Sequence, residues 1–315
     1  MPNDISGDFP TDIYRSRKDS IPHIIDRADP VIWSDSGNSR VLSHEQQDFY
    51  ERNGYLFIEN VFSADEIATL RREAEALRKA GETEEDVIRE ASSNAVRSVF
   101  RIHEKNRTYL NLMADDRLSA IAEHLLADDV YIHQSRVNFK PAFKGKEFYW
   151  HSDFETWHTE DGMPRMRALS MSITLSENTA YNGPLMLVPG SHKKFISCVG
   201  ETPDDNYKNS LKAQEYGTPD QESLTAMIRK HGLAAPTGPA GSVLIFDCNT
   251  LHGSGNNITP FPRSNAFFVY NSMKNRLVAP FAAKSPRPDF LATRDNIRPI
   301  RSRPNIAAAR LHAAE

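Results

Sequence analysis

Cysteine is scarce in this chain of 315 residues, and long apolar runs are absent. The two cysteines, Cys198 and Cys248, are too few for a disulfide framework and lack the spacing of metal ligands. No run approaches the ~20 apolar residues of a membrane span, and the first residues lack the basic and apolar stretches of a signal peptide. These features exclude a disulfide-stapled scaffold and a membrane-spanning protein. They predict two partly buried thiols in a protein of the reducing cytoplasm.

An excess of charge of one sign is missing as well. The chain has 42 acidic and 38 basic residues and a net charge of −4, so no strong field directs it toward nucleic acid or an anionic membrane. We therefore expect neither of these partners and a small soluble ligand instead. The length suits one large domain, because all-β barrels and sandwiches commonly fill this range as a single unit.

The first part of the chain carries helical signals behind an extended arm. Residues 1–40 mix Pro, Asp, Ser and Arg without a stable period, which predicts an arm over the surface. Two helices are expected at 43–54 and 63–81, since each range begins with a capping box and ends at glycine. A third helical pattern covers about 111–127. The second helix has one apolar stripe that would pack against a sheet, formed by Ile67, Leu70, Ala74 and Leu77.

From residue 130 onward the pattern changes to a period of two, which is typical of β-strands because alternate residues share a face. One strand places Gln134, Arg136 and Asn138 on the same side. A second strand, 167–175, has an apolar face and a small polar face that suits a cavity wall; taken alone, a solvent-facing side explains such a polar face equally well. The apolar face comprises Leu169, Met171, Ile173 and Leu175, and the polar face Ala168, Ser170, Ser172 and Thr174.

Several more short strands follow, and together they indicate the fold class. They are expected at 184–188, 242–247 and 264–271. Many short strands behind a helical layer predict a mainly β protein with flanking helices, a jelly roll. We expect one such domain over residues 41–298, with the polar segment 197–232 as an insertion or lid. Residues 299–315 are expected to form a C-terminal tail without an assigned function.

A histidine and a carboxylate stand two residues apart in His151-Ser152-Asp153, close to a strand. Such a pair provides two thirds of the 2-His-1-carboxylate triad of non-haem Fe(II) oxygenases. The motif alone is weak, because one His-x-Asp arises easily by chance in a chain with 11 histidines. The third ligand is expected near a distant strand, since a jelly roll brings remote strands together around its mouth. His252 fits, as it follows a buried strand and would be exposed in a Gly-rich bend.

Arg263 stands eleven residues after His252 and opens the next strand. Arginine binds carboxylates through two parallel hydrogen bonds, so a guanidinium at this point suits the far end of a dicarboxylate. The pattern therefore predicts that Arg263 anchors 2-oxoglutarate. Asn265 and Phe267 share its strand face and are expected to line the same cavity, whereas Ala266 and its alternate neighbours would point the other way.

Two further histidines could compete for the metal. His158 and Glu160 form a His-x-Glu pair, but the surrounding segment 155–162 is hydrophilic, and we interpret it as a solvated loop. His192 follows Pro189-Gly190-Ser191, where a role in capping a turn is expected rather than metal binding.

These motifs together resemble those of the phytanoyl-CoA hydroxylase-like oxygenases. The matching features are His151-x-Asp153, the segment from Asn182-Gly183-Pro184-Leu185 to Pro189-Gly190-Ser191-His192, and His252 followed by Arg263. The stretch 148–170 also resembles the signature of the ectoine hydroxylases within that family, and the similarity extends from about residue 10 to 295. The resemblance implies a double-stranded β-helix, which is a cupin-like jelly roll.

The resemblance further implies a dioxygenase that converts ectoine, a compatible solute of osmotic stress, to 5-hydroxyectoine. Fe(II) would be the only metal, O2 the oxidant, and 2-oxoglutarate would be decarboxylated to succinate and CO2. Contacts to 2-oxoglutarate are implied for Phe100, Asn138, Phe148, Ser170, Ser254 and Arg263. Contacts to ectoine are implied for Gln134, Arg136, Thr156, Trp157, Phe246, Asn265 and Phe267. A homodimer is an expectation from the family alone.

Ectoine is zwitterionic, so its pocket should supply a cation for the carboxylate and aromatic faces for the amidinium-like ring. Arg136 with Gln134 suits the first task, and Trp157 with Phe246 or Phe267 suits the second. Two alternatives stay open at this point. One is an oxygenase of the same family with another small substrate, and the other is a jelly-roll protein that binds a solute without turnover.

Overall fold

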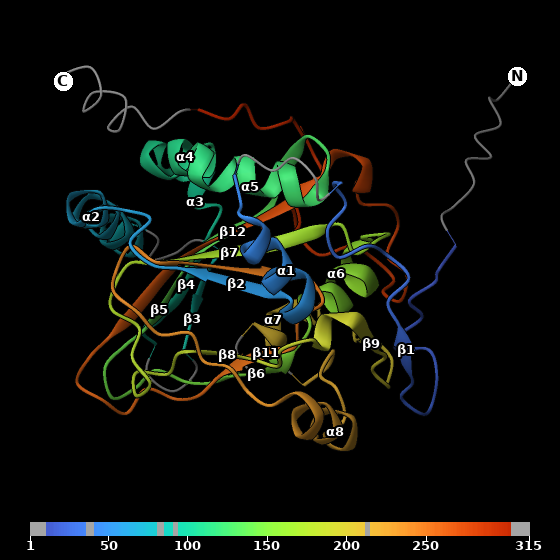
Figure 1. Ribbon diagram of the computed structural model, residues 1–315. Helices are drawn as coiled ribbons and strands as arrows, with labels where there is room; N and C mark the ends of the chain where they lie inside the picture. The colour runs from blue at the N-terminus through green and yellow to red at the C-terminus, as the bar shows by residue number, and fades with distance from the viewer. Residues whose placement is uncertain (1–10, 36–40, 81–84, 91–93, 212–214, 304–315) are drawn as a thin grey trace, which may run out of the picture.

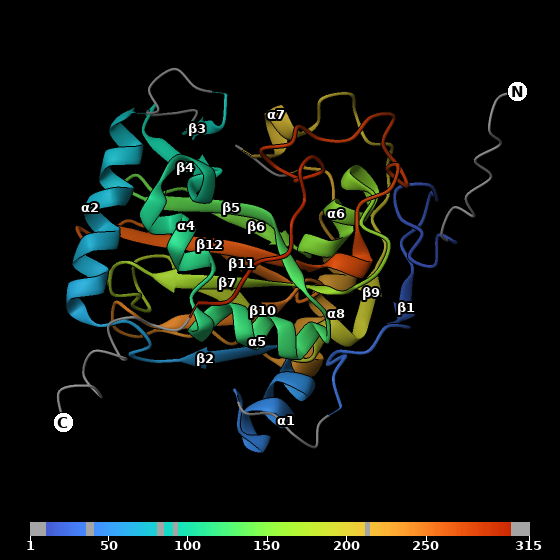
Figure 2. The same ribbon diagram turned by 90° about the horizontal axis from the view of Figure 1, so that it is seen from above.

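The computed structural model describes residues 11–35, 41–80, 85–90, 94–211 and 215–303. Its main sheet has seven strands in the order β2-β10-β7-β12-β5-β4-β3, and each neighbouring pair is antiparallel (Figures 1 and 2). The strands are β2 (Tyr55–Ile58), β10 (Val243–Asp247), β7 (Ala168–Thr174), β12 (Arg263–Ser272), β5 (Val130–Lys140), β4 (Val96–Phe100) and β3 (Val87–Arg89).

A smaller sheet lies on one side of the main sheet and a helical layer on the other (Figure 1). The small sheet has the order β6-β11-β8 and consists of β6 (Phe148–His151), β11 (His252–Ser254) and β8 (Leu185–Leu187). The helical layer consists of α2 (Ala64–Ala80), α4 (Arg107–Met113) and α5 (Asp116–Leu126). Two antiparallel sheets with helices on the outer face confirm the predicted jelly roll.

The first two expected helices are present with their expected caps. Helix α1 (His44–Asn53) begins with a reciprocal capping box between Ser43 and Gln46, and it ends at Gly54, whose φ of 76° is left-handed. Helix α2 begins after Ser63, which exchanges the same pair of hydrogen bonds with Glu66. All four members of its expected apolar stripe are buried. The expected stop at residue 81 lies outside the described residues.

The third helical pattern was expected as one helix but is broken into two. Helix α4 follows the short α3 (Ile102–Lys105) and ends before residue 114, and α5 begins after Asp115. The carboxylate of Asp115 accepts a hydrogen bond from the backbone N–H of Arg117, so it caps a new helix. A periodic apolar pattern continues across the break, because both helices pack on the same core.

The two faces of the main sheet differ as the period of two predicts. On the helix side, Met171, Ile173, Ala266, Phe268 and Tyr270 belong to the principal apolar core with α2, α4 and α5. The strand register aligns the opposite faces of β5, β7 and β12 into one polar wall. This wall is formed by Gln134, Arg136, Asn138, Lys140, Ser170, Ser172, Thr174, Arg263, Asn265 and Phe267. We call it the cavity face.

The N-terminal segment was expected to run over the surface, and this is wrong for part of it. Its strand β1 (Ile24–Asp26) is exposed and pairs with β9 (Lys194–Ile196), but Tyr14 and Arg17 are buried. Arg17 reaches two carboxylates of helix α6 (Asp153–Asp161) at 2.6 Å each, and this pairing with residues far along the chain is invisible in the local pattern. The segment therefore holds α6 in place.

The remaining elements lie in the connection from β8 to β10 and directly after β12. They are η1 (Ser191–Lys193), α7 (Tyr207–Ser210), α8 (Gln221–His231) and η2 (Met273–Asn275). Helix α8 ends at His231 and is followed by Gly232 at its C-cap. Among the described residues, no helix has both the length and the apolar character that crossing a membrane requires.

Candidate active site

Three side chains from two distant parts of the chain meet at one point. His151, Asp153 and His252 each offer a ligand atom, and these atoms lie within 4.8 Å of one another. The Oδ1 atom of Asp153 is 3.7 Å from Nε2 of His151 and 3.9 Å from Nε2 of His252. Within the part of the chain that the structure describes, this is the one such cluster of His, Cys, Asp and Glu side chains.

Strand pairing positions the two histidines, and the start of a helix positions the aspartate. Strands β6 and β11 pair in a register that sets His151 directly opposite His252, and the imidazole centroids are 4.3 Å apart. Asp153 is the first residue of α6, where the helix N-terminus favours a negative charge. His252 was expected to be exposed in a bend, but it starts β11 and is only 3% exposed, because β6 and β8 pair on both sides of that strand.

Hydrogen bonds orient all three side chains toward the common point. Nδ1 of His151 donates to the carbonyl of Tyr149 at 2.7 Å, and Nδ1 of His252 donates to the carbonyl of Thr250 at 2.9 Å. A carbonyl only accepts, so each Nδ1 carries the proton and each Nε2 keeps its lone pair. The second oxygen of Asp153 accepts a hydrogen bond from the hydroxyl of Ser170 at 3.1 Å.

The charges in this cluster suit a divalent cation. Burial, with His252 next, lowers the pKa of His151 to about 4, so this imidazole is neutral at pH 7. Burial would raise the pKa of Asp153, but the two histidines, Arg136 and Ser170 outweigh it and the net shift is downward. Two neutral imidazoles and one carboxylate on one side of a cation are the donor set of the Fe(II) facial triad. The residues present therefore fit Fe(II).

Arg263 opens β12 on the cavity face and is buried without an acidic partner. It is 7% exposed, its Nε has no hydrogen-bond partner, and among the described residues no carboxylate forms an ion pair with it. Burial lowers its pKa to about 10. A buried charge without a partner is costly, so this position indicates a binding site for an anion.

Lys140 is a second cation at the same place, and the sequence reasoning missed it. It is the cross-strand partner of Arg263 and is 3% exposed. Its Nζ donates to the hydroxyl of Ser254 at 2.8 Å and to the carbonyl of Gly255 at 2.6 Å. Burial, together with the charge of Arg263, lowers its pKa to about 6. The signal was available, because Lys140 continues the polar alternation that ends in Asn138.

Of the other residues implied for 2-oxoglutarate, Ser254 and Phe148 contact Lys140, whereas Asn138 and Phe100 lie farther along the main sheet. Ser254 faces Phe148 in the pairing of β11 with β6, and the ring of Phe148 has Lys140 Nζ at 5.7 Å from its centroid. Asn138 follows along β5, and its carbonyl oxygen accepts from the hydroxyl of Ser98 at 2.8 Å, which leaves its NH2 group to donate elsewhere. The pairing of β4 with β5 sets Phe100 opposite Arg136.

The residues implied for ectoine continue along the same face. Arg136 lies over the ring of Phe267, with 4.7 Å from Cζ to the ring centroid, and it donates to the side-chain oxygen of Gln134. The NH2 group of Gln134 donates to the carbonyl of Leu291 at 2.8 Å. Both ends of the Gln134 amide are thus engaged, so in this structure it holds Arg136 in place.

Asn265 stands between Arg263 and Phe267 on the cavity face of β12, and Phe246 lies beside a metal ligand. Asn265 donates to the hydroxyl of Ser172 at 2.9 Å, and its buried carbonyl oxygen has no partner. The ring of Phe246 is 5.0 Å from that of His252. The unpaired buried oxygen of Asn265 indicates a site for a ligand with an N–H donor.

Thr156 and Trp157 lie on α6, and this helix corrects the expectation of a solvated loop over 155–162. Its residues are almost all buried, including His158, which pairs with Asp12 at 3.0 Å. Glu160 pairs with Arg17, so neither member of the His-x-Glu pair is free to hold a metal. The segment looked hydrophilic because the partners of its charges lie far away in the sequence.

His192 was expected to have a structural role, and its surroundings agree with one. It is fully buried in η1, and its Nε2 donates to the carbonyl of Glu51 at 3.1 Å. Both cysteines are free and buried, and burial raises the pKa of each thiol.

Known proteins match this chain over most of its length. The family model for phytanoyl-CoA dioxygenase matches residues 50–265. An ectoine dioxygenase from Sphingopyxis alaskensis is 54% identical over 285 residues, which cover 90% of this chain and 93% of the relative. The ectoine dioxygenase of Halomonas elongata is 49% identical over 270 residues, which cover 85% of this chain and 81% of that protein.

Solved structures agree with these relatives. The crystal structure of EctD from S. alaskensis with 2-oxoglutarate and 5-hydroxyectoine matches with a TM-score of 0.86 at 47% identity, covering 94% of this chain and 99% of that one. The form of the same protein with bound Fe has a TM-score of 0.84. The carbocyclase SnoK, 22% identical with a TM-score of 0.58, shares the fold. The chain belongs to the phytanoyl-CoA dioxygenase family.

Proposed function

We propose that this protein is an ectoine hydroxylase, which forms 5-hydroxyectoine while 2-oxoglutarate is decarboxylated to succinate and CO2. One observation carries the proposal: the three-ligand metal cluster meets the cavity face at Ser170, which binds Asp153, and an unpaired buried guanidinium lies on that same face. His151, Asp153 and His252 would hold Fe(II), and Arg263 would hold the far carboxylate of 2-oxoglutarate. Bound Fe(II) supplies the activation of O2 that both oxidations need. The identity to ectoine dioxygenases supports ectoine as the substrate.

The cosubstrate is assigned to the Arg263 end of the cavity face. Arg263 and Lys140 supply positive charge there, and Ser254 and Asn138 supply hydrogen-bonding groups. The dicarboxylate would extend from these cations toward the metal ligands, with Phe148 and Phe100 as apolar walls. Ser170 stands at the metal end, where its hydroxyl already binds Asp153.

Ectoine is assigned to the end of the cavity face that lies beyond Asn265. Phe267 is four residues from Arg263 on β12, which is about 13 Å along a strand. Arg136 would bind the ectoine carboxylate, and the unpaired oxygen of Asn265 would accept from a ring N–H. Phe246 and Trp157 would provide aromatic surface for the amidinium-like ring, with Thr156 beside Trp157 on α6.

We further propose that residues 41–298 act as one domain, because strands from both ends of this range share the main sheet. The segment 197–232 is proposed as an insertion that covers one side of the cavity. In support, Tyr207 of α7 contacts Phe290, which contacts Phe100 at the end of β4. The arm 1–40 and the tail 299–315 were expected outside this domain, but Tyr14, Arg17 and Ile300 are buried against it. Residues after 303 lie outside the described part of the chain.

Two further expectations remain proposals. We place the reaction in the cytoplasm, where thiols stay reduced, because Cys198 and Cys248 are both free thiols. The homodimer expected from the family stays a prediction as well.

A turnover assay tests the proposed function against both alternatives. With Fe(II), ascorbate, 2-oxoglutarate and ectoine, we expect equal amounts of succinate and 5-hydroxyectoine. Succinate without hydroxyectoine would mean that ectoine is not the substrate and that another family substrate must be sought. Binding of ectoine with no succinate at all would favour a solute-binding protein without turnover.

Substitution of Lys140 tests the second cation of the cosubstrate site. We expect Lys140→Met to raise the KM for 2-oxoglutarate on the order of 10-fold, the size of one lost hydrogen bond to a charged group, and to leave the KM for ectoine unchanged. Binding should also be tighter at pH 6 than at pH 8 in the unaltered protein. The pKa of Lys140 is about 6, and a bound carboxylate would raise it, so binding takes up a proton above pH 6.

The control for this test is Lys144→Met, which removes an exposed lysine four residues away. It should match the unaltered protein in both KM values and in their pH dependence. An unchanged KM for 2-oxoglutarate in Lys140→Met would remove Lys140 from the site.

A further inference from the structure

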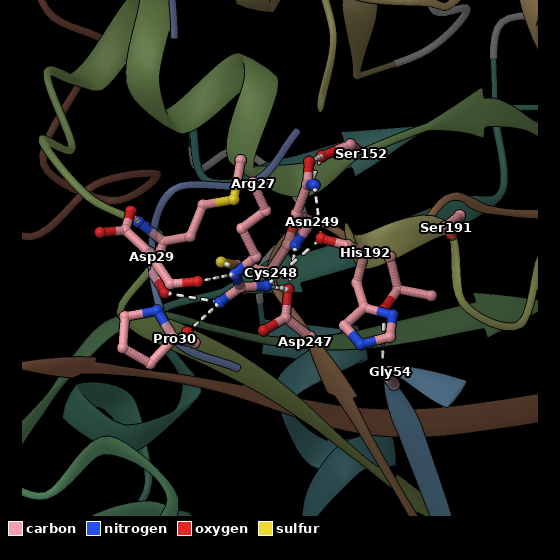
Figure 3. Close-up of polar contacts among 12 residues, drawn as sticks. Arg27, Asp29, Pro30, Gly54, Ser152, Ser191, His192, Asp247, Cys248 and Asn249 are labelled. Atoms are coloured by element: carbon pink, nitrogen blue, oxygen red, sulfur yellow. Dashed lines mark hydrogen bonds and ion pairs between the residues drawn. The ribbon is translucent and has the colours of Figure 1, made fainter. Parts of the chain in front are cut away.

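A buried polar network is centred on Asn249 and includes Ser152, the residue between His151 and Asp153 (Figure 3). Asn249 is 1% exposed and stands in the turn between β10 and β11. Its NH2 group donates to the carbonyls of His192 at 3.0 Å and Lys194 at 2.9 Å. Its carbonyl oxygen accepts a hydrogen bond from the hydroxyl of Ser152 at 2.9 Å. All three hydrogen bonds of this amide therefore cross to other segments of the chain.

The network joins the two segments that carry the metal ligands. Ser152 stands between His151 and Asp153, and Asn249 stands three residues before His252. The two ligand segments are almost a hundred residues apart in sequence. The hydrogen bond between these side chains therefore adds a buried side-chain link between the ligand segments, beside the pairing of β6 with β11 and the backbone hydrogen bond from Phe154 to Cys248.

Asn249 is itself held from two sides. Its backbone N–H donates to the carboxylate of Asp247 at 2.8 Å, and the same carboxylate oxygen accepts from Arg27 at 2.8 Å. Arg27 also donates to the carbonyls of Asp29 and Pro30, as the dashed lines in Figure 3 show. The turn that contains Asn249 is thus tied to the N-terminal segment.

The Pro-Gly-Ser-His turn provides the other support. The hydroxyl of Ser191 accepts from the backbone N–H of Leu251 at 2.9 Å, and the carbonyl of His192 accepts from Asn249. The motif stood out in the sequence but supplies no ligand in the proposed function. Its contacts show that it holds the turn leading into His252.

We propose that Asn249 is a positioning residue of the metal centre, which sets the separation of the two ligand segments through Ser152. The inference rests on the metal-binding role proposed for His151, Asp153 and His252. Outer-shell partners of metal ligands typically contribute 10- to 100-fold in metal affinity. Asparagine suits this position because its one amide both donates twice and accepts once. A carboxylate here would face two carbonyls and the Asp247 carboxylate without a proton to donate.

Metal titration of the full-length protein tests this role without any turnover. Co(II) is the probe, followed through its visible absorption bands, with Fe(II) competition as a second readout. We expect Asn249→Ala to raise the Kd for Co(II) on the order of 10- to 100-fold and to change the shape of the bands. Ser152→Ala, which removes one of the three hydrogen bonds, should raise the Kd by a smaller factor. The double variant should bind Co(II) no more weakly than Asn249→Ala alone, because both substitutions remove the same hydrogen bond between Ser152 and Asn249.

The matched control is Asn271→Ala at the end of β12. Asn271 is equally buried, donates to Tyr131 Oη at 2.8 Å and to the Asn275 carbonyl at 2.9 Å, and accepts from Asn275 at 2.9 Å. Asn271→Ala loses as many hydrogen bonds as Asn249→Ala. Its Tm should therefore fall by a similar amount, while its Kd for Co(II) stays unchanged.

The outcomes separate this inference from the proposed function. An equal change in Kd for Asn249→Ala and Asn271→Ala, or no change in either, would overturn the positioning role. If Asn249→Ala does not fold, an unchanged Kd and unchanged bands in Ser152→Ala would overturn it as well. Absence of Co(II) and Fe(II) binding in the unaltered protein would instead overturn the proposed metal centre.

Discussion

Asp153→Ala should abolish metal binding and the formation of both products. Asp153 supplies the one carboxylate of the cluster, and its Oδ1 lies within 4 Å of Nε2 of both His151 and His252. Without this charge, two neutral imidazoles would have to hold a divalent cation alone. The loss in affinity should exceed about 100-fold, which is the upper end for outer-shell partners. Titration with Co(II) and assays of succinate and hydroxyectoine measure the effect.

The control for this variant is Asp65→Ala in the first turn of α2. It also removes a carboxylate from the first turn of a helix, but Asp65 is exposed and far from the cluster in sequence. Both metal affinity and turnover should match the unaltered protein. If Asp153→Ala retains tight metal binding and product formation, the metal centre lies elsewhere in the chain.

The sequence was informative wherever a period of two decided the answer. The cavity faces of β5, β7 and β12 could be listed before the register was known, because strand geometry alone puts alternate residues on one side. Arg263 and Phe267 were placed on one wall in this way. The positions of β6 and β11 in the sequence do not predict that these strands pair. The contact of His151 with His252 could therefore be inferred only from the types of the ligands.

The environment of α6 could not be predicted, because it depends on long-range ion pairs. The segment 153–161 has a charged composition, which locally indicates exposure. Glu155 and Glu160 both pair with Arg17, and Asp161 pairs with Arg287 at 2.5 Å. These partners lie more than a hundred residues away in the sequence, where no local pattern connects them to the helix.

The missed role of Lys140 has a different cause. A lysine at the end of a strand is usually exposed, because moving its charge out of water is costly. Here the ammonium donates to Ser254 and Gly255, and the pairing of β5 with β12 carries it to Arg263. Two buried basic side chains next to each other are costly for stability, which favours the binding role proposed for them.

Arg263→Met should weaken the binding of 2-oxoglutarate without lowering the stability of the ligand-free protein. Loss of one partner from a buried charge pair costs about 2–5 kcal/mol, so the KM for 2-oxoglutarate should rise roughly 30-fold or more. The KM for ectoine should not change, since ectoine is assigned to the other end of the cavity face. Arg263→Lys should fall in between, because an ammonium keeps the charge but loses the two-pronged geometry.

In the ligand-free protein the same variant should be at least as stable as the unaltered chain. Burial lowers the pKa of Arg263 to about 10, so the folded state holds this proton less tightly than the unfolded state does. At every pH below 10 the charge is present and costs stability, and methionine removes that cost. Thermal unfolding without ligand measures the effect, and added 2-oxoglutarate should then stabilise the unaltered protein more than the variant.

The exposed Arg229 of α8 provides the control for both halves of this prediction. Arg229→Met removes the same charge from the surface, so it should leave the KM and the thermal midpoint nearly unchanged. A variant at Arg263 that loses stability but keeps its affinity for 2-oxoglutarate would show that the guanidinium supports the fold. Weaker binding of 2-oxoglutarate together with an equal or higher thermal midpoint would show that the buried charge of Arg263 serves an anionic ligand at a cost in stability.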